Sequence, residues 1–597
     1  MKIVKKILSI LSSREKNRFI LIVIFGIISS IFEVTGLISI LPFIAVLTNP
    51  EIVQENYILN NIFIYSNIIG INTEKDFLIL VGIFTFIIFT FSLILRAFLA
   101  YFSARFSAMC QFNVSKRVVS GYLNKPYSWF LDRNTSELGK NILSEVSIVI
   151  SAGLMSLLNL IIYVILSIFI LSLLIIIDPL VTIIISLVIG LFYLFFYKFF
   201  FSSLKNQSEK RFLSNKWRFK TISETFAALK EIKLLGIETI LIERFSEPAK
   251  KMAKSQASLM AINKLPRFAI EALTFGGILI ISILLVLTNK NFVSAMPIIA
   301  LYAFAGYRLM PSFQTIYLSI SLLRTVGPPL NALNKDISNL IEYKKKRKDY
   351  STLDFKKQIN LKDVSYQYSN DSKKVLDKIN ISIPIGTSVG LTGPTGSGKT
   401  TLVDIILGLI RTNHGDVIID NEKILDNNIR AWQNCIGYVP QQIYLADDTI
   451  EANIAFGKDE NEINHKRIIE VAKLADIHEF INSELPLKYQ TNVGERGTRL
   501  SGGQRQRVGI ARALYQNPKV IVFDEATSAL DFETEKKIIN SILNIRNKKT
   551  VIFITHKIEA IKEFDRIIVL DKGKIIESAK YPDLIRQSAY FKSQLDN

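Results

Sequence analysis

The sequence predicts a chain of two parts: an α-helical membrane domain with six transmembrane helices, and a C-terminal α/β domain built around a phosphate-binding loop. Three observations predict this fold class. Long apolar runs occupy the first half of the 597 residues and end near residue 325. Beyond residue 359, short β-branched runs alternate with helical stretches, as in a mostly parallel sheet. A glycine-rich stretch at 393–400 separates one of these strands from a helix.

Composition agrees with a membrane domain. The residues are 49% apolar and the mean hydropathy is +0.30, which is high for a soluble protein. A net charge of +20 would suit a nucleic-acid ligand, but the apolar runs favour basic cytoplasmic loops, so we expect no nucleic-acid partner. Cys110 and Cys435 are too far apart to indicate a disulfide framework or a cysteine-rich metal site. The first residues lack a signal-peptide pattern and suit an amphipathic cytoplasmic segment.

Six apolar runs are near or above the ~20 residues that a membrane-spanning helix needs. They lie at 18–47, 77–103, 153–177, 180–203, 267–288 and 292–325. Asp178 and Pro179 separate the third run from the fourth and predict a tight turn. Because the bilayer core offers no water to backbone polar groups, all six runs are expected to be helices.

Basic residues predict the orientation of these helices. Lys and Arg gather before the first span, between the second and third, and between the fourth and fifth. The opposite loops, near 48–76, 178 and 289–291, carry only Lys75 and Lys290. Because basic loops stay in the cytoplasm, we expect both termini there.

The domain organisation follows from the same pattern. The two long basic stretches are expected to be membrane helices that continue into the cytoplasm. Residues 341–358 are highly charged and are expected to form a solvated linker. The predicted parts are therefore a transmembrane domain (1–340), this linker and the α/β domain (359–597).

The phosphate-binding loop is a complete G-x-x-x-x-G-K-[ST] motif between a predicted strand and a predicted helix. Its residues are Gly393, Pro394, Thr395, Gly396, Ser397, Gly398, Lys399 and Thr400, and Thr401 follows them in the expected nucleotide site. The glycines let backbone N–H groups wrap around phosphates, and the helix N-terminus favours negative charge. We expect Lys399 to contact the β- and γ-phosphates of ATP and Thr400 to help hold Mg²⁺. The motif predicts a P-loop nucleotide-binding domain.

Two carboxylates follow the apolar strand that begins at Val520. Asp524 suits the shell of a Mg²⁺ ion, directly or through water, and Glu525 suits a general base that polarises the attacking water. Alone, this pattern fits a buried strand capped by solvated acids equally well. The phosphate-binding loop upstream favours catalysis.

A second glycine-rich turn precedes a basic helix. Its residues are Leu500, Ser501, Gly502, Gly503 and Gln504. A turn of this kind at a helix start is another anion-binding nest. One chain does not need two nests for one nucleotide, whereas a dimer that closes each nucleotide between two chains does. The sequence therefore predicts a dimer.

These motifs resemble those of ATP-binding cassette (ABC) ATPases over the whole C-terminal region. The resemblance implies that Tyr368 stacks on adenine and that His556 contacts the γ-phosphate. It implies that Gln441 contacts Mg²⁺ and water and senses the membrane domain. Residues 491–497 would face the coupling helices, and Ser528–Asp531 would signal between two ATP sites. Alone, Tyr368 and His556 would be more typical of structural residues; their order among the other motifs assigns them to the ATP site.

The order of the two parts resembles that of ABC exporters. It implies a half-transporter in a bacterial inner membrane that works with a second copy of itself, or with a related half-transporter, on two ATP molecules. It also implies coupling helices near 127–135 and 222–230.

Three arginines in the predicted spans are candidates for substrate contacts. Counting ~1.5 Å per residue from the outer ends places Arg96, Arg267 and Arg308 in the cytoplasmic half of the membrane. If they face a cavity, they form a cationic collar for a phosphate or pyrophosphate group; otherwise they are interfacial anchors. Glu33 in the first span allows the same two interpretations.

The membrane domain is also similar to bacterial flippases for lipid-linked oligosaccharides. The similar segments are FEVTGLISILPFI (32–44), LRAFLAYF (95–102), LPRFAIEA (265–272) and LYAFAGYRLMPS (301–312). This resemblance implies that a polyprenyl-pyrophosphate oligosaccharide is flipped outward. A multidrug, lipid or peptide exporter and an ATP-gated channel or regulator on the same scaffold are the alternatives, and the presence of Glu525 and His556 argues against a role without hydrolysis.

Overall fold

The structure is a computed structural model that describes residues 2–66, 68, 71, 73–287, 292–341, 353–368, 373–527, 532–545, 549–588 and 591. It consists of two compact units. The helical unit comprises Met1–Lys125 and Asp132–Lys345, and the sheet unit comprises Pro126–Leu131 and Lys346–Asn597. Residues 342–352 of the predicted linker lie outside the described residues.

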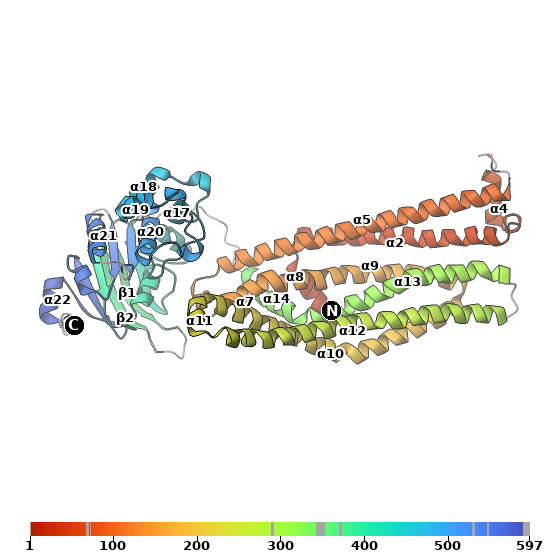
Figure 1. Cartoon of the computed structure of the whole chain (residues 1–597), viewed down its shortest axis with the longest axis horizontal. Helices are drawn as coiled ribbons and strands as arrows, with labels where there is room; N and C mark the ends of the chain where they lie inside the picture. Colours follow the sequence, from red (N-terminus) through yellow and green to blue (C-terminus); the bar gives the residue numbers. More distant parts are fainter. Residues whose placement is uncertain are drawn as a thin grey trace. The chain divides into compact units, whose positions relative to one another are not determined.

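Long helices that run side by side make up the helical unit (Figure 1). They are α1 (Lys2–Ile10), α2 (Ser13–Thr48), α3 (Ile52–Glu55), α4 (Tyr57–Ser66), α5 (Glu74–Leu123), α7 (Thr135–Lys140), α8 (Val146–Ile148), α9 (Met155–Ile177), α10 (Pro179–Ala227), α11 (Leu229–Leu235), α12 (Glu238–Leu287), α13 (Phe292–Thr325) and α14 (Gly327–Ile341). Two π-helical segments, η2 (Asn141–Glu145) and η3 (Val149–Leu154), join α7, α8 and α9 into one run. The main packing pairs are α10 with α12, α2 with α5, and α9 with α13.

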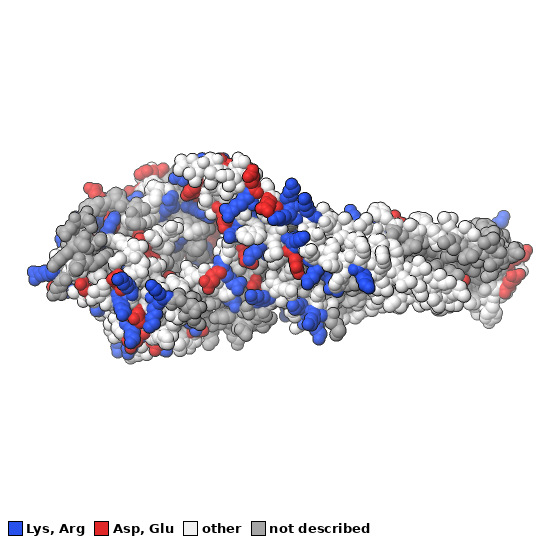
Figure 2. Space-filling model, turned by 90° about the horizontal axis from the view of Figure 1, so that it is seen from below, with Lys and Arg blue, Asp and Glu red and all other residues white. Residues whose placement is uncertain are grey.

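Among the described residues, four helical runs are long and apolar enough to cross a membrane: Ser13–Thr48, Glu74–Leu123, Thr135–Ile177 and Thr182–Ala227. The first three contain the first three predicted spans, and the fourth covers the fourth span from Thr182 onward. The fifth and sixth lie on α12 and α13, which include residues whose placement is not described. Figure 2 shows the corresponding surface as a broad band without charged residues in the helical unit. The helical part of the predicted fold class is therefore confirmed.

Local sequence explains where these helices begin and end. Ser12 and Glu15 form a capping box at the start of α2, and Thr73 caps α5. Asp178 is extended and Pro179 opens α10, so the chain breaks between the third and fourth spans as predicted. Helices α5, α10 and α12 continue well beyond their apolar stretches.

The sheet unit contains a six-stranded sheet in the order β10-β9-β3-β8-β7-β6 and a four-stranded antiparallel sheet in the order β2-β1-β4-β5. The strands are β1 (Gln358–Tyr366), β2 (Leu376–Pro384), β3 (Ser388–Thr392), β4 (His414–Ile419), β5 (Glu422–Lys423), β6 (Ile436–Val439), β7 (Val520–Asp524), β8 (Thr550–Ile554), β9 (Arg566–Asp571) and β10 (Lys574–Ala579). The helices are α6 (Ser128–Leu131), α15 (Lys399–Ile406), α16 (Ile429–Gln433), α17 (Ile450–Ile454), α18 (His465–Leu474), α19 (His478–Ser483), α20 (Gly502–Tyr515), α21 (Phe532–Ile545) and α22 (Tyr581–Gln587).

Strand register places the functional loops together. Strands β9, β3, β8, β7 and β6 are parallel, and only β10 is antiparallel to its neighbour among the described strands of this sheet. Ile554 of β8 is paired with both Leu391 of β3 and Asp524 of β7, and Phe523 is paired with Val439 of β6. The loops after β3, β6, β7 and β8 therefore leave the sheet at one carboxyl edge, where open α/β sheets bind ligands.

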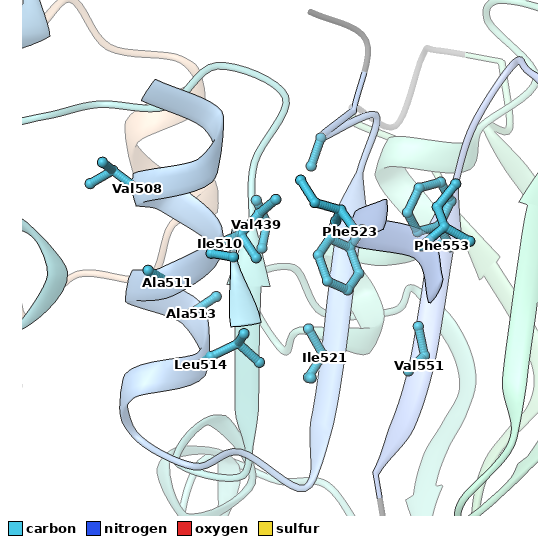
Figure 3. Close-up of a cluster of buried hydrophobic side chains, with 14 of the residues drawn as sticks. Val439, Val508, Ile510, Ala511, Ala513, Leu514, Ile521, Phe523, Val551 and Phe553 are labelled. Atoms are coloured by element: carbon cyan, nitrogen blue, oxygen red, sulfur yellow. The ribbon is translucent and has the colours of Figure 1, made fainter. Parts of the chain in front are cut away.

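A buried apolar layer holds α20 against this sheet. In Figure 3, Ile521, Phe523, Val551 and Phe553 from β7 and β8 point toward the face that α20 covers. In Figure 3 the chain passes from Val508 to Leu514 along α20 in the direction opposite to that from Ile521 to Phe523 along β7, so the helix runs antiparallel to that strand. The N-terminus of α20 is therefore directed toward the carboxyl edge of the sheet.

Candidate active site

The phosphate-binding loop lies between β3 and α15, and its glycines are required by the backbone. Gly393 has φ +148°, and a Cβ atom there would lie 2.0 Å from the Leu570 carbonyl oxygen. Gly398 has φ +104°, and its Cβ would lie 2.9 Å from the Val375 carbonyl oxygen. Gly396 also has a positive φ of +80°. Because L-residues avoid this region and these contacts, the loop keeps its narrow curve only with glycine.

Lys399 is buried beneath this loop. Its Nζ donates hydrogen bonds to the carbonyl oxygens of Gly393 and Pro394, both at 2.9 Å. Burial lowers the pKa of Lys399, and the charges of Glu525 and Asp524 oppose that shift. The Ser397 hydroxyl is buried and has no hydrogen-bond partner among the described residues. A buried ammonium group and an unused hydroxyl in a curved glycine loop fit a bound phosphate chain.

Asp524 ends β7 directly beside the loop. The Tyr438 hydroxyl, from the end of β6, donates a hydrogen bond to Asp524 Oδ2 at 3.2 Å. Burial raises the pKa of Asp524, which the hydrogen bond from Tyr438 and the charge of Lys399 counter. Thr400 is exposed on the first turn of α15. Among the described residues, no group of three or more His, Cys, Asp or Glu side chains could hold a metal ion by itself. The predicted Mg²⁺ ligands Asp524, Thr400 and Gln441 include one carboxylate.

Glu525 is the centre of a polar cluster. Its φ of +49° is unusual for a residue with a side chain, and its N–H donates to the Ile554 carbonyl oxygen at 3.1 Å. Glu525 Oε2 accepts a hydrogen bond from Gln441 Nε2 at 2.7 Å, and Oε1 lies 3.0 Å from His556 Nε2. Gln441 and His556, the other two side chains assigned to catalysis, therefore both contact Glu525 at the carboxyl edge.

Tyr368 contacts Thr401, directly after the phosphate-binding loop, and its side chain is largely exposed. Its hydroxyl is 3.1 Å from Thr401 Oγ1, and its ring meets Tyr366 edge to face at 5.1 Å between centroids. The side chain is 54% exposed. A ring that is held through its hydroxyl and is more than half exposed suits stacking on a nucleotide base.

The second glycine-rich turn forms the start of α20. Ser501 Oγ accepts a hydrogen bond from the Gln504 N–H, and Gln504 Oε1 accepts one from the Ser501 N–H, which is a capping box. Within the described residues, Ser501, Gly502, Gly503 and Gln504 make no hydrogen bond to the loop 393–400. The predicted signalling loop Ser528–Asp531 lies outside the described residues.

The predicted coupling segments lie where helices end or are interrupted. Residues 127–135 include α6, which is grouped with the sheet unit, and 222–230 contain the break between α10 and α11.

Two of the three membrane arginines share one carboxylate. Glu33 Oε1 lies 3.0 Å from Arg308 Nη1 and 3.3 Å from Arg96 Nη1, on helices α2, α13 and α5. The side chains of Glu33 and Arg308 are 6% and 7% exposed, and that of Arg96 is 36% exposed. Arg267 instead pairs with Glu271 at 2.7 Å, one turn along α12. The structure thus brings Arg96 and Arg308 together through Glu33 and gives Arg267 a separate partner.

Comparison with known proteins agrees with this geometry. The ABC transporter transmembrane region matches residues 19–312, and the ABC transporter domain matches residues 376–528. The chain belongs to the ABC transporters. It is a half-transporter, because one membrane region is fused to one ABC ATPase domain.

Relatives of this half-transporter carry several functions. Over 236 residues it is 41% identical to the ATP-dependent lipid A-core flippase of Saccharophagus degradans, and the aligned region covers 40% of each chain. Over 281 residues it is 37% identical to the leukotoxin translocation ATP-binding protein of Mannheimia haemolytica, which covers 47% of this chain and 38% of that protein. The matches thus span less than half of these relatives.

A solved structure of a bacterial Atm1-family ABC exporter with ATP bound covers 98% of both chains, with a TM-score of 0.77 and 22% identity. At this identity the similarity concerns the fold.

Sequence reasoning missed Tyr438 and left two interpretations open for Glu33. Tyr438 holds the carboxylate of Asp524, and its place at the end of a parallel strand was the available signal. Glu33 was left ambiguous, and only the packing of α2, α5 and α13 identifies it as the counter-ion of two arginines.

Proposed function

We propose that this half-transporter forms a homodimer in a bacterial inner membrane and uses ATP to flip a lipid-linked oligosaccharide, or a related phospholipid-like substrate, from the inner to the outer leaflet. A related half-transporter is the alternative partner. The observation that carries the ATP-driven part is the contact of Glu525 with Gln441 and His556 at the edge that also holds Lys399.

Each of these side chains has a role in hydrolysis under this proposal. The loop N–H groups and Lys399 bind the phosphates, and Tyr368 stacks on adenine. Glu525 accepts a proton from the attacking water, which Gln441 helps to orient, and His556 contacts the γ-phosphate. Asp524 and Thr400 would hold Mg²⁺, which neutralises phosphate charge when bound.

The proposed dimer gives the second glycine-rich turn a function. Ser501 and its neighbours make no hydrogen bond to the described phosphate-binding loop of the same chain, and the N-terminus of α20 is directed toward the ligand edge (Figure 3). A helix start of this kind attracts phosphate. A partner chain that presents Ser501 to the loop 393–400 would close each nucleotide between two chains and couple closure to the membrane helices.

The substrate assignment rests on charge inside the membrane domain. Arg96, Arg308 and Glu33 together leave one net positive charge at a depth where ionised groups are costly and mark function. A pyrophosphate group would be favoured there. Moving such a headgroup through hydrocarbon without a protein path is prohibitive, which is the reason for an ATP-driven route. The similarity to a lipid A-core flippase supports a phosphorylated lipid.

ATP hydrolysis by the purified protein in lipid nanodiscs tests the proposal. Polyprenyl-pyrophosphate glycans should stimulate hydrolysis, and Arg96→Gln and Arg308→Lys should reduce the stimulation while basal hydrolysis persists. Arg105→Gln on the same helix as Arg96 is the matched control. Unchanged stimulation in both arginine variants would reject the arginine assignment.

A protein exporter is the second candidate, because of the similarity to a leukotoxin translocation protein. Stimulation by unfolded polypeptide, with no response to the lipid, would favour it.

A further inference from the structure

A small cavity with polar and apolar side chains in its wall lies between α10, α12 and α13, and its lining does not include Arg96, Arg308 or Glu33. Its volume is about 190 Å³, and its wall includes Tyr193, Lys264, Arg267 and Gln314. These three helices pack on one another in the helical unit (Figure 1). Arg267 marks the inner start of the fifth predicted span, so the cavity belongs to the cytoplasmic half of the membrane domain.

Two polar groups in this wall are candidates for contacts with a ligand. The Tyr193 hydroxyl and the Gln314 side-chain nitrogen are buried, and neither has a hydrogen-bond partner among the described residues. Buried polar groups are nearly always paired, so each unpaired group requires an explanation. Both are donors, and the two cations beside them, Lys264 and Arg267, are donors too. All four groups suit an oxygen-rich anion.

The surrounding contacts hold this donor set in place. Pro266 removes the helical donor for the Ile262 carbonyl oxygen, and the Tyr317 hydroxyl donates to that oxygen at 3.4 Å. The Tyr193 ring lies against Tyr317 and Phe313, with centroids 5.8 and 6.1 Å away. The Tyr317 hydroxyl is therefore engaged, whereas that of Tyr193 remains available to a ligand.

Size restricts the ligand. At about 30 Å³ per water, the cavity has room for roughly six waters. Pockets for drug-sized molecules start at about 300 Å³, so a bulky apolar compound does not fit. A phosphate or pyrophosphate group fits in both size and charge.

We propose that this cavity, here named the Tyr193–Gln314 cavity, is a docking site for the phosphate of a lipid headgroup at the cytoplasmic end of the membrane domain. This inference rests on the proposed flippase function. It adds a first binding site that the substrate occupies before it reaches the Arg96–Arg308 cluster. Lys264 and Arg267 attract the headgroup, and Tyr193 and Gln314 donate hydrogen bonds to its oxygens.

Direct binding to the full-length protein in detergent, without ATP, tests the cavity. One arm titrates a fluorescent polyprenyl pyrophosphate, and a second, independent arm titrates a fluorescent phosphatidylglycerol. Tyr193→Phe and Gln314→Leu should each raise the Kd by about tenfold, as expected for loss of a hydrogen bond to a charged oxygen. Tyr302→Phe is the matched control, because its hydroxyl already lies 3.1 Å from Thr182 Oγ1.

The arms distinguish the source of the phosphate. Weaker binding of the pyrophosphate alone assigns the cavity to the substrate, and weaker binding of both lipids assigns it to the phosphate that they share. If the variants weaken the binding of phosphatidylglycerol alone, the cavity is not a binding site for the transported substrate. If both variants bind both lipids like the Tyr302→Phe control, the cavity is not a phosphate site.

Failure of the cavity and failure of the proposed function give different results. If the cavity variants bind both lipids normally and polyprenyl-pyrophosphate glycans still stimulate hydrolysis, the proposed phosphate site in the cavity is rejected and the proposed flippase function is retained. If the native protein binds no polyprenyl pyrophosphate, the substrate assignment fails, and the phosphatidylglycerol arm alone decides the cavity.

Discussion

Replacing Glu33 by Gln should destabilise the membrane domain strongly. The carboxylate is the counter-ion of Arg308 at 3.0 Å, and both side chains are buried. At an effective dielectric constant near 20, two charges about 4 Å apart interact by about 4 kcal/mol. Removing one member of a buried pair costs about 3–5 kcal/mol, because the other charge stays buried without compensation. The half-exposed Arg96 adds little, about 0–1 kcal/mol.

Unfolding of the purified protein in detergent measures this loss. Glu33→Gln should lower the free energy of unfolding by about 3–5 kcal/mol. Glu271→Gln is the matched control, because it releases Arg267 from a more exposed pair within one helix, and a loss of about 0.5 kcal/mol or less is expected.

A double-mutant cycle decides whether the charge itself is responsible. Glu33→Gln combined with Arg308→Gln removes both buried charges and should be much more stable than Glu33→Gln alone. The reasoning is refuted if the two losses simply add, or if Glu33→Gln is as mild as Glu271→Gln.

Three further predictions concern the sheet unit. Glu525→Gln should reduce ATP hydrolysis by about 10²–10⁴-fold in a phosphate-release assay while ATP binding persists, and near-native turnover would exclude Glu525 as the base. Gly393→Ala should abolish binding of a fluorescent ATP analogue, because its Cβ would lie 2.0 Å from the Leu570 carbonyl oxygen, and retained binding would contradict this. Burial, with the charge of Asp524, raises the pKa of Asp404 from 3.8 to about 6. Its stabilising contribution to the free energy of unfolding is therefore fully present below pH 3.8 and is lost as the pH rises through 6. Asp404→Asn should raise the free energy of unfolding by about 1–2 kcal/mol at pH 8, after a discount for partial solvent screening, and by almost nothing near pH 4; equal effects at both would refute the assignment.

Much of the ATP site was predictable because strand and motif order determine it. In a parallel sheet the loops after β3, β6, β7 and β8 lie at one edge, and the sequence motifs in those loops indicate phosphate binding and hydrolysis. The contact of Glu525 with Gln441 and His556 follows from that topology together with the left-handed backbone at Glu525. No sequence pattern indicates this backbone conformation for a glutamate.

Features that depend on packing between distant helices were not predictable. The sequence places Glu33, Arg96 and Arg308 at membrane depth, but hydropathy does not say which face of each helix meets another. The π-helical segments η2 and η3 are a second example. They position Lys140 and Glu145, both fully buried and 3.8 Å apart, and their residues show ordinary helical preferences.

In both sites the charged groups contact partners within the chain, and a bound phosphate must replace those partners. Lys399 donates to carbonyl oxygens of its own loop, and Arg96 and Arg308 contact Glu33. The affinity for phosphate is therefore the difference between the new contacts and the lost ones, which lets such a site release its ligand after a modest rearrangement. Removing the internal partner should strengthen phosphate binding as it weakens the fold. Glu33→Gln is expected to bind polyprenyl pyrophosphate more tightly than the native protein, although it unfolds more easily. Weaker binding by a folded Glu33→Gln protein would show that Glu33 positions the arginines for the substrate and does not compete with it.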